Sequence, residues 1–167
     1  MLLAKALAEL PVHHGRALDL ATGTGNGLAL LAGRYSVYGL DRSRVMLRYA
    51  RRQVPRAAMV CGEARRPPFR SGSFALVSCI GLAEYLPEMG ELLQAIGSSL
   101  CPKGAAVVSV SPANALLVAR RALGHRLYYH DPEAVRKWAA ISRLTVERVI
   151  ASCSQRLYVL RKAGGPR

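Results

Sequence analysis

The stretch Ala17-Leu-Asp-Leu-Ala-Thr-Gly-Thr-Gly-Asn-Gly27 decides the fold of this chain. Its apolar residues predict a strand over 16–20, its glycines predict a tight turn, and the residues from Asn26 to Ala32 predict a helix. A second apolar segment, Ser36–Leu40, is followed at once by the lone carboxylate of Asp41. The pattern therefore predicts a strand–turn–helix–strand unit, with which many α/β folds begin.

This unit has the geometry for holding an adenosyl ligand. Glycines let the backbone approach a ligand closely, and a carboxylate at the end of the second strand can accept two hydrogen bonds from a ribose diol. A dinucleotide fingerprint would place its third glycine at position 28, which is Leu28, so a nicotinamide dehydrogenase is disfavoured. The alternative is a turn without a ligand in which Asp41 caps the next helix, although Ser43 already fits the capping position.

Predicted strands and helices alternate along the chain. Further strands are predicted over 57–61, 74–79 and 105–110, and further helices over 2–10, 43–53, 87–100, 113–123 and 131–139. The last two apolar segments, 144–150 and 156–160, predict an antiparallel hairpin. We therefore expect an α/β, Rossmann-like, doubly wound fold whose mostly parallel seven-stranded sheet ends in a C-terminal antiparallel hairpin that adds an antiparallel edge strand. No linker interrupts the pattern, so residues 1–167 are expected to form a single domain.

The composition is strongly basic. The 24 Lys and Arg residues outnumber the 10 Asp and Glu residues, and the formal net charge is +14. This balance favours an anionic partner such as nucleic acid, acidic lipid or an acidic metabolite, and an Arg-rich proteome with solvated arginine faces explains it equally well. The few Asn and Gln residues are typical of a thermophile.

Other features of the composition restrict the class of protein. The hydrophobic content of 51% excludes a disordered chain, and no uninterrupted apolar run reaches the length of about 18 residues that a membrane span needs. The segment from Met1 to Leu10 lacks the features of a signal peptide, so we expect a cytoplasmic protein without a transmembrane segment. The four cysteines have no zinc-site spacing, so no metal is expected, and Cys61 and Cys79 are predicted to be small buried hydrophobic residues. A disulfide is expected only if the source is a hyperthermophile.

In their order along the chain, these motifs resemble those of the class I S-adenosylmethionine-dependent methyltransferases. Besides the glycine turn and Asp41, the resemblance includes Cys61-Gly-Glu-Ala-Arg-Arg-Pro-Pro-Phe69 and Gly72-Ser-Phe-Ala-Leu-Val-Ser-Cys79. It is greatest with the small-molecule and lipid branch often labelled type 11. The chain departs from the family pattern at Glu63 and at Ala75, where the family usually has Asp.

The resemblance implies S-adenosyl-L-methionine as the cofactor and a set of residues to hold it. By this resemblance Asp19 would help to hold the methionine ammonium, Asp41 the ribose, and Glu63 the adenine amino group. The complete set of expected cofactor-binding residues is Asp19, Ala21, Gly23, Gly25, Asp41, Arg42, Met46, Glu63, Ala64, Ser78, Cys79 and Ile80.

The implied reaction is in-line transfer of a methyl group from a sulfonium to a nucleophile. Because the sulfonium is a good leaving group, alignment and desolvation can supply most of the rate, and a base is needed only where the nucleophile must lose a proton. We predict Glu84 and His130 as catalytic residues because they flank the expected mouth of the site. Alternatively, Glu84 supports the following helix and His130 is a surface group.

Three functions remain open at this point. The first is a methyltransferase acting on a small-molecule or lipid-like acceptor. The second, motivated by the charge, is an RNA methyltransferase, although the arginines of the 43–53 helix are more typical of a solvated face. The third is a cofactor-binding, non-catalytic partner subunit, motivated by the short segment before the first strand, which leaves an open mouth for a partner or a homodimer to close.

Overall fold

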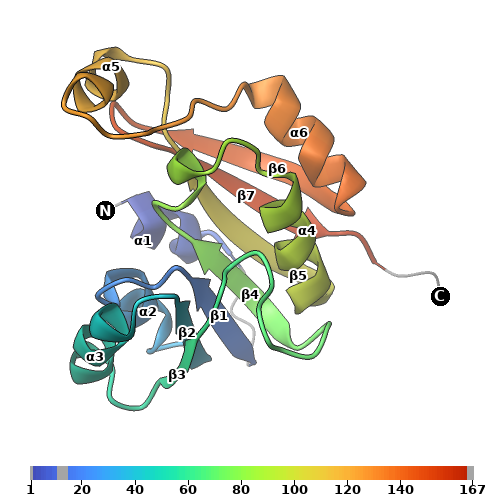
Figure 1. Ribbon diagram of the computed structural model, residues 1–167. Helices are drawn as coiled ribbons and strands as arrows, with labels where there is room; N and C mark the ends of the chain where they lie inside the picture. Colours follow the sequence, from blue (N-terminus) through green and yellow to red (C-terminus); the bar gives the residue numbers. More distant parts are fainter. Residues whose placement is uncertain (1, 11–14, 165–167) are drawn as a thin grey trace.

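The computed structural model describes residues 2–10 and 15–164, which form one seven-stranded sheet with helices on both faces (Figure 1). The strands, in chain order, are β1 (Arg16–Leu20), β2 (Ser36–Asp41), β3 (Ala58–Cys61), β4 (Phe74–Cys79), β5 (Leu100–Val110), β6 (Leu144–Ala151) and β7 (Arg156–Lys162). Their spatial order is β3-β2-β1-β4-β5-β7-β6, and the pairs from β3 across to β5 are parallel. The predicted α/β, doubly wound and mostly parallel sheet is therefore confirmed.

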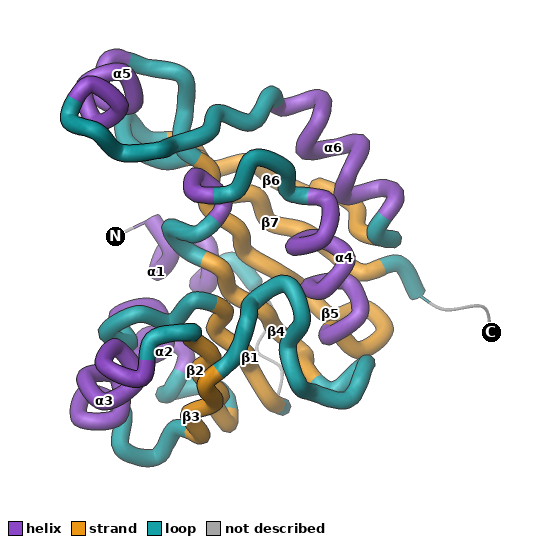
Figure 2. Tube along the Cα trace, viewed as in Figure 1, coloured by secondary structure: helices purple, strands orange, loops and turns teal. Residues whose placement is uncertain are grey.

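Helices cover both faces of the sheet, and α5 stands apart from them at the upper left of the tube view in Figure 2. The helices are α1 (Leu2–Ala8), α2 (Asn26–Leu31), α3 (Arg44–Gln53), α4 (Gly90–Ser99), α5 (Ala115–Ala122) and α6 (Pro132–Ile141), with a 3-10 turn η1 (Ala83–Tyr85). Ser43 caps α3 as expected, because its side chain accepts a hydrogen bond from the Met46 amide. Asp131 caps α6 by accepting from two amides in the first turn of that helix.

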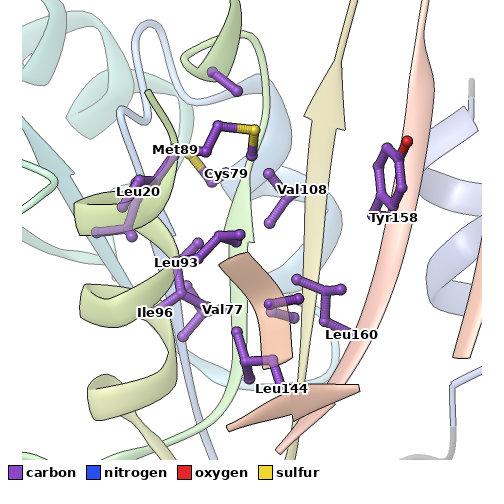
Figure 3. Close-up of a cluster of buried hydrophobic side chains, with 14 of the residues drawn as sticks. Leu20, Val77, Cys79, Met89, Leu93, Ile96, Val108, Leu144, Tyr158 and Leu160 are labelled. Atoms are coloured by element: carbon purple, nitrogen blue, oxygen red, sulfur yellow. The ribbon is translucent and has the colours of Figure 1, made fainter. Parts of the chain in front are cut away.

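Each face of the sheet has its own hydrophobic core. On one face, side chains of α1 and α2 such as Leu7 and Leu31 pack against residues such as Val107. On the other face, α4 and α6 cover a cluster that includes Val77, Leu93 and Tyr158 (Figure 3). Full burial of each large apolar side chain stabilises the fold by about 1.5–3 kcal/mol. Because both faces are covered, the central strands are continuous apolar runs, as expected of a buried parallel sheet.

The closing hairpin differs in one respect from the prediction. The strand that runs against the others is β7, and it lies inside the sheet between β5 and β6. The edge strand β6 has the same direction as β1 to β5. The reason lies in burial, since four consecutive residues of β7, 157–160, are buried, whereas most of β6 is exposed or only partly buried. The more continuously apolar strand takes the interior position.

Two predicted element starts are also corrected. The helix expected from Pro87 begins at Gly90, after the η1 turn, which the sequence pattern did not indicate. The strand expected from position 105 begins at Leu100, which pairs with Phe74. Residues 102–104 form a bulge within β5, where Lys103 has a positive φ of 63°.

Candidate cofactor-binding site

The sheet reverses its winding between β1 and β4, and a cleft opens there at the carboxyl ends of the strands. Ligands of doubly wound sheets bind at this kind of switch point. The cleft has a volume of about 750 Å³ and receives residues from the ends of the strands, from α3 and from the loop after β4. Its lining residues are Ala21, Gly23, Leu40, Asp41, Arg42, Met46, Gly62, Glu63, Ala64, Arg65, Ile80, Gly81, Leu82, Tyr85, Leu86 and Arg126.

The glycine turn between β1 and α2 is held in an unusual backbone conformation. Ala21, Gly23 and Gly25 have φ values of 54°, 54° and 93°, a region that favours glycine. The Thr22 amide donates to the Leu40 carbonyl oxygen at 3.0 Å, and the Gly25 amide donates to the Thr22 carbonyl oxygen at 2.9 Å. These bonds attach the turn to β2 and present Ala21 and Gly23 to the cleft.

The glycines of the fingerprint have three different functions. A Cβ added at Gly23 would meet no atom within 4 Å, and this residue lines the cleft. At Gly25 the added atom would lie 3.0 Å from the Cα of Ala50, so this glycine lets α3 pack against the turn. At Gly27 it would lie 3.2 Å from a carboxylate oxygen of Asp19. Gly25 and Gly27 therefore make room for the protein itself, and Gly23 leaves open space at the cleft.

Asp41 fastens the turn to the next helix. Its Oδ2 accepts from the Gly23 amide at 2.9 Å and its Oδ1 accepts from the Ser43 amide at 2.8 Å. Ser43, not Asp41, is the N-cap of α3. A carboxylate has about four acceptor positions, so both oxygens can still accept from a diol. The carboxylate is half-buried and lines the cleft, held in place by two backbone donors.

Asp19 lies beneath the turn, where it is 3% exposed, and does not line the cleft. Its carboxylate accepts from the Thr22 hydroxyl at 2.7 Å and from the Ser78 hydroxyl of β4 at 2.5 Å. Burial raises the pKa of Asp19 to about 6, although these hydrogen bonds and one from the Leu28 backbone oppose the rise. Asp19 thus ties together β1, the turn and β4 at the switch point.

The expected cofactor-binding residues fall into two groups. One group lines the cleft: Ala21, Gly23, Asp41, Arg42, Met46, Glu63, Ala64 and Ile80. The second group lies below it: Asp19, Gly25, Ser78 and Cys79. Cys79 is fully buried in the core, as predicted, and this burial, followed by the charge of Asp19, raises the pKa of its thiol. Cys61, expected to be buried, is exposed, and all four cysteines are free thiols.

Glu63 lines the cleft two residues after the end of β3. Its carboxylate pairs with Arg65 at 3.3 Å, and Arg65 also pairs with Glu91 at 3.1 Å. These side chains are between 42% and 61% exposed, and ion pairs at such exposure contribute at most about 1 kcal/mol. The Glu63 carboxylate can therefore exchange Arg65 for a ligand donor at small cost.

The two predicted catalytic residues do not line the cleft. Both Glu84 carboxylate oxygens accept from Arg120, at 3.1 and 3.2 Å, and Glu84 also accepts from the Ser111 hydroxyl. His130 is 3% exposed, and its Nε2 lies 2.9 Å from the Ala83 carbonyl oxygen. Since a carbonyl only accepts, Nε2 carries the proton and donates. Both side chains hold the η1 turn, and neither faces the cleft as an available base.

The sequence pattern did not single out several lining residues. Among these residues are Tyr85 and Arg126. Tyr85 and its apolar neighbours Leu82 and Leu86 reach the cleft because η1 folds the loop after β4 over it. Arg126 comes from the loop after α5, which contacts η1 through the Tyr128 amide and the Glu84 carbonyl oxygen at 2.7 Å. The apolar residues after β4 were a usable signal, whereas Arg126 had none.

Comparison with known proteins agrees with this geometry. A family model described as a methyltransferase domain matches residues 17–104, which is more than half of the chain and includes both strand ends that carry Asp19 and Asp41. This chain therefore belongs to the class I S-adenosylmethionine-dependent methyltransferase family.

Two curated relatives illustrate the range of acceptors in this family. A trans-aconitate 2-methyltransferase of Methylobacterium radiotolerans is 35% identical over 64% of this chain and 42% of its own length. A phosphatidylethanolamine N-methyltransferase of Cereibacter sphaeroides is 28% identical over 85% of this chain and 76% of its own length. The chain spans less than half the length of several other curated relatives, including one of which it covers 24%.

Solved structures share the fold at low identity. The magnesium protoporphyrin IX methyltransferase of Synechocystis, with bound S-adenosylhomocysteine, has a TM-score of 0.79 at 17% identity, and the match covers 97% of this chain and 80% of that one. The complex of the Trm112 methyltransferase activator with a proposed methyltransferase from Haloferax volcanii has a TM-score of 0.85 at 18% identity, covering 98% and 89%. Both confirm the Rossmann-like architecture.

Proposed function

We propose that this chain binds S-adenosyl-L-methionine in the cleft between β1 and β4 and transfers its methyl group to a small-molecule or lipid-like acceptor. One observation carries the proposal. The Asp41 carboxylate is fixed by the amides of Gly23 and Ser43 at 2.9 and 2.8 Å, directly beside a turn whose Gly23 leaves open space. A diol acceptor and a bare backbone, side by side in a cleft of about 750 Å³, suit an adenosyl group.

Different lining residues would bind different parts of the cofactor. Asp41 would accept from the ribose, Glu63 would accept from the adenine amino group, and Ala64, Met46 and Leu82 provide apolar surface for the ring. The bound cofactor supplies an activated methyl group on a sulfonium, which needs no further activation by the protein. The protein's contribution is therefore to fix the geometry and exclude water.

We assign Glu84 and His130 to positioning. Glu84 holds Arg120, whose Nη2 also lies 3.3 Å from the Tyr85 hydroxyl, so this network sets where Tyr85 stands at the cleft. His130 holds the neighbouring carbonyl of Ala83. If the acceptor must lose a proton, the hydroxyl of Tyr85, a lining residue, is a candidate to interact with it.

The acceptor class rests on the relatives and on the lining. The relatives act on trans-aconitate and on phosphatidylethanolamine, a small acid and a lipid. The cleft lining includes the apolar side chains of Ile80, Leu82 and Leu86. It also includes three cations, which are Arg42, Arg65 and Arg126. This combination suits an acceptor with an apolar part and an anionic group. A cytoplasmic site of action is part of the proposal, and the four free thiols support it.

Isothermal titration with S-adenosylhomocysteine tests cofactor binding. The wild-type chain should bind it, Asp41→Ala should bind it about 10- to 100-fold more weakly, and the exposed helix variant Glu133→Gln should match wild type. Transfer of a labelled methyl group to acid and lipid acceptors then tests the reaction. Absence of binding at millimolar ligand by the folded chain would overturn the proposal.

Two other functions have one supporting observation each. The net charge of +14 supports RNA as the acceptor, and methyl incorporation into tRNA or rRNA, with none into acids or lipids, would establish it. The structural similarity to a methyltransferase bound to an activator supports a role that needs a partner subunit. Light scattering would detect a homodimer, and turnover by an isolated monomer would exclude a need for any partner.

A further inference from the structure

The helix α3 and the short segments that flank it carry a group of arginines without ion-pair partners among the described residues. No acidic residue occurs between Asp41 and Glu63, and this interval contains six arginines, all of them exposed. Within the part of the chain that the structure describes, none of their guanidinium groups lies in an ion pair. The six arginines are Arg42, Arg44, Arg48, Arg51, Arg52 and Arg56. Together with the exposed apolar residues Val45, Met46 and Tyr49, we call them the α3 surface.

Three apolar side chains project among these arginines. Val45, Met46 and Tyr49 are 48%, 39% and 52% exposed. Their spacing places them on one side of the helix. The guanidinium carbon of Arg52 lies 5.9 Å from the centroid of the Tyr49 ring.

These side chains are not unfilled core positions. The inner side of α3 is already occupied by Leu47 and Ala50, which are 8% and 0% exposed. The helix lies at the periphery of the molecule beside α2, next to β2 and β3 (Figure 1). Its apolar outer residues therefore face whatever lies outside the protein.

We propose that the α3 surface docks the protein onto an anionic lipid bilayer. The surface combines many separated cations with apolar tips, and a bilayer interface offers both counterparts: anionic headgroups and, just below them, an apolar phase. Tyrosine is favoured at the headgroup level, and arginine stems can lie along apolar surface while their charges stay in water. Nucleic acid would satisfy the arginines and could stack on Tyr49, but it would leave the exposed side chain of Val45 without an apolar partner.

Docking in this way places the cleft at the membrane. Arg42 and Met46 belong both to the α3 surface and to the lining of the cleft. A lipid-like acceptor could therefore reach the cleft while most of it stays in the bilayer. This last step rests on the proposed function, whereas the docking itself does not.

Vesicle co-sedimentation tests the docking. The full chain should bind vesicles of phosphatidylcholine mixed with phosphatidylglycerol, and should not bind phosphatidylcholine alone. The double variant Arg48→Glu/Arg52→Glu should lose at least about 30-fold in vesicle affinity, because each arginine near an anionic surface contributes about fivefold. Tyr49→Ser, which leaves the charge unchanged, should also weaken binding.

The matched control is Arg136→Glu/Lys137→Glu on α6. It makes the same change of charge at two exposed helix positions, and neither residue lies in an ion pair among those described. It should stay within about threefold of wild type. If the control loses as much vesicle affinity as the α3 variant, only net charge matters. If the wild-type chain binds single-stranded RNA more tightly than vesicles, and the α3 variant loses this RNA binding, the surface belongs to nucleic acid. Either result overturns the proposal.

Circular dichroism and titration with S-adenosylhomocysteine on the same variants separate the two proposals. Arg48 and Arg52 do not line the cleft, so the α3 variant should fold and should bind S-adenosylhomocysteine as wild type does. If the wild-type chain binds S-adenosylhomocysteine but does not bind vesicles, the docking proposal fails and the proposed function remains. If the wild-type chain binds vesicles but does not bind S-adenosylhomocysteine, the proposed function fails and the docking proposal remains.

Discussion

The buried carboxylate of Asp19 should make the stability of this protein depend on pH in an unusual direction. Burial raises its pKa from 3.8 to about 6, so the native state favours the protonated form. Between about pH 4 and pH 6 the native protein therefore holds a proton that the unfolded chain has released. The contribution of Asp19 to the free energy of unfolding is fully present below about pH 4. It is lost as the pH rises through about 6. The full change is about 3 kcal/mol, since one pKa unit corresponds to about 1.4 kcal/mol.

The substitution Asp19→Asn removes this titration while keeping the size of the side chain. We expect the free energy of unfolding of the wild type, minus that of the variant, to fall by about 3 kcal/mol from about pH 4 to about pH 7. Urea unfolding at a series of pH values, followed by fluorescence of Trp138, the single tryptophan, measures this difference. Taking differences cancels the groups that titrate in both proteins.

A second variant tests the cause of the raised pKa. The Ser78 hydroxyl donates to Asp19 at 2.5 Å and lowers the pKa, so Ser78→Ala should move the decline in stability to higher pH. A difference between wild type and Asp19→Asn that stays flat across the series would refute the reasoning. It would mean that the hydrogen bonds to Asp19 compensate fully for burial and that the carboxylate is ionised throughout.

Other predictions concern the turn, the cleft and η1. Gly27→Ala should cost about 1–3 kcal/mol in urea unfolding because its Cβ would lie 3.2 Å from the buried carboxylate below, while Gly33→Ala, with nothing within 4 Å, should be neutral or slightly stabilising. Asp41→Asn should weaken S-adenosylhomocysteine binding in calorimetry by about tenfold or more, since an amide cannot accept from both backbone donors. Arg120→Ala should lower the melting temperature more than Glu84→Gln, because it leaves a carboxylate 11% exposed without its cation.

The parts of the fold that could be predicted are those with local signals. The strand–turn–helix unit, the helix caps at Ser43 and Asp131 and the seven strands follow from periodicity, glycines and capping residues close together in sequence. The bulge in β5 and the η1 turn could not be predicted, because both depend on partners elsewhere in the fold. Leu100 continues β5 only because Phe74 lies opposite it, and η1 is held from α5 and the loop that follows it.

The site shows the same division. Residues attached to strand ends, such as Gly23 and Asp41, line the cleft as the motif indicated, because a strand end at the switch point has one position in this fold. Arg126 reaches the cleft from a loop whose course depends on contacts with η1, and no spacing in the sequence encodes that course. Residue type alone also misled at Glu84, since the sequence does not show that Arg120, 36 residues away, occupies its carboxylate.

The fingerprint as a whole serves to build the cleft before any ligand arrives. Gly27 leaves room for Asp19, Asp19 joins β1 to β4 through Ser78, and Asp41 joins the turn to the start of α3. Two carboxylates are thus committed to backbone and hydroxyl donors in the folded chain, and the entropy of ordering the turn is lost on folding and not on binding. A ligand then meets fixed acceptors and open space, which is the arrangement that favours tight binding and accurate alignment for methyl transfer.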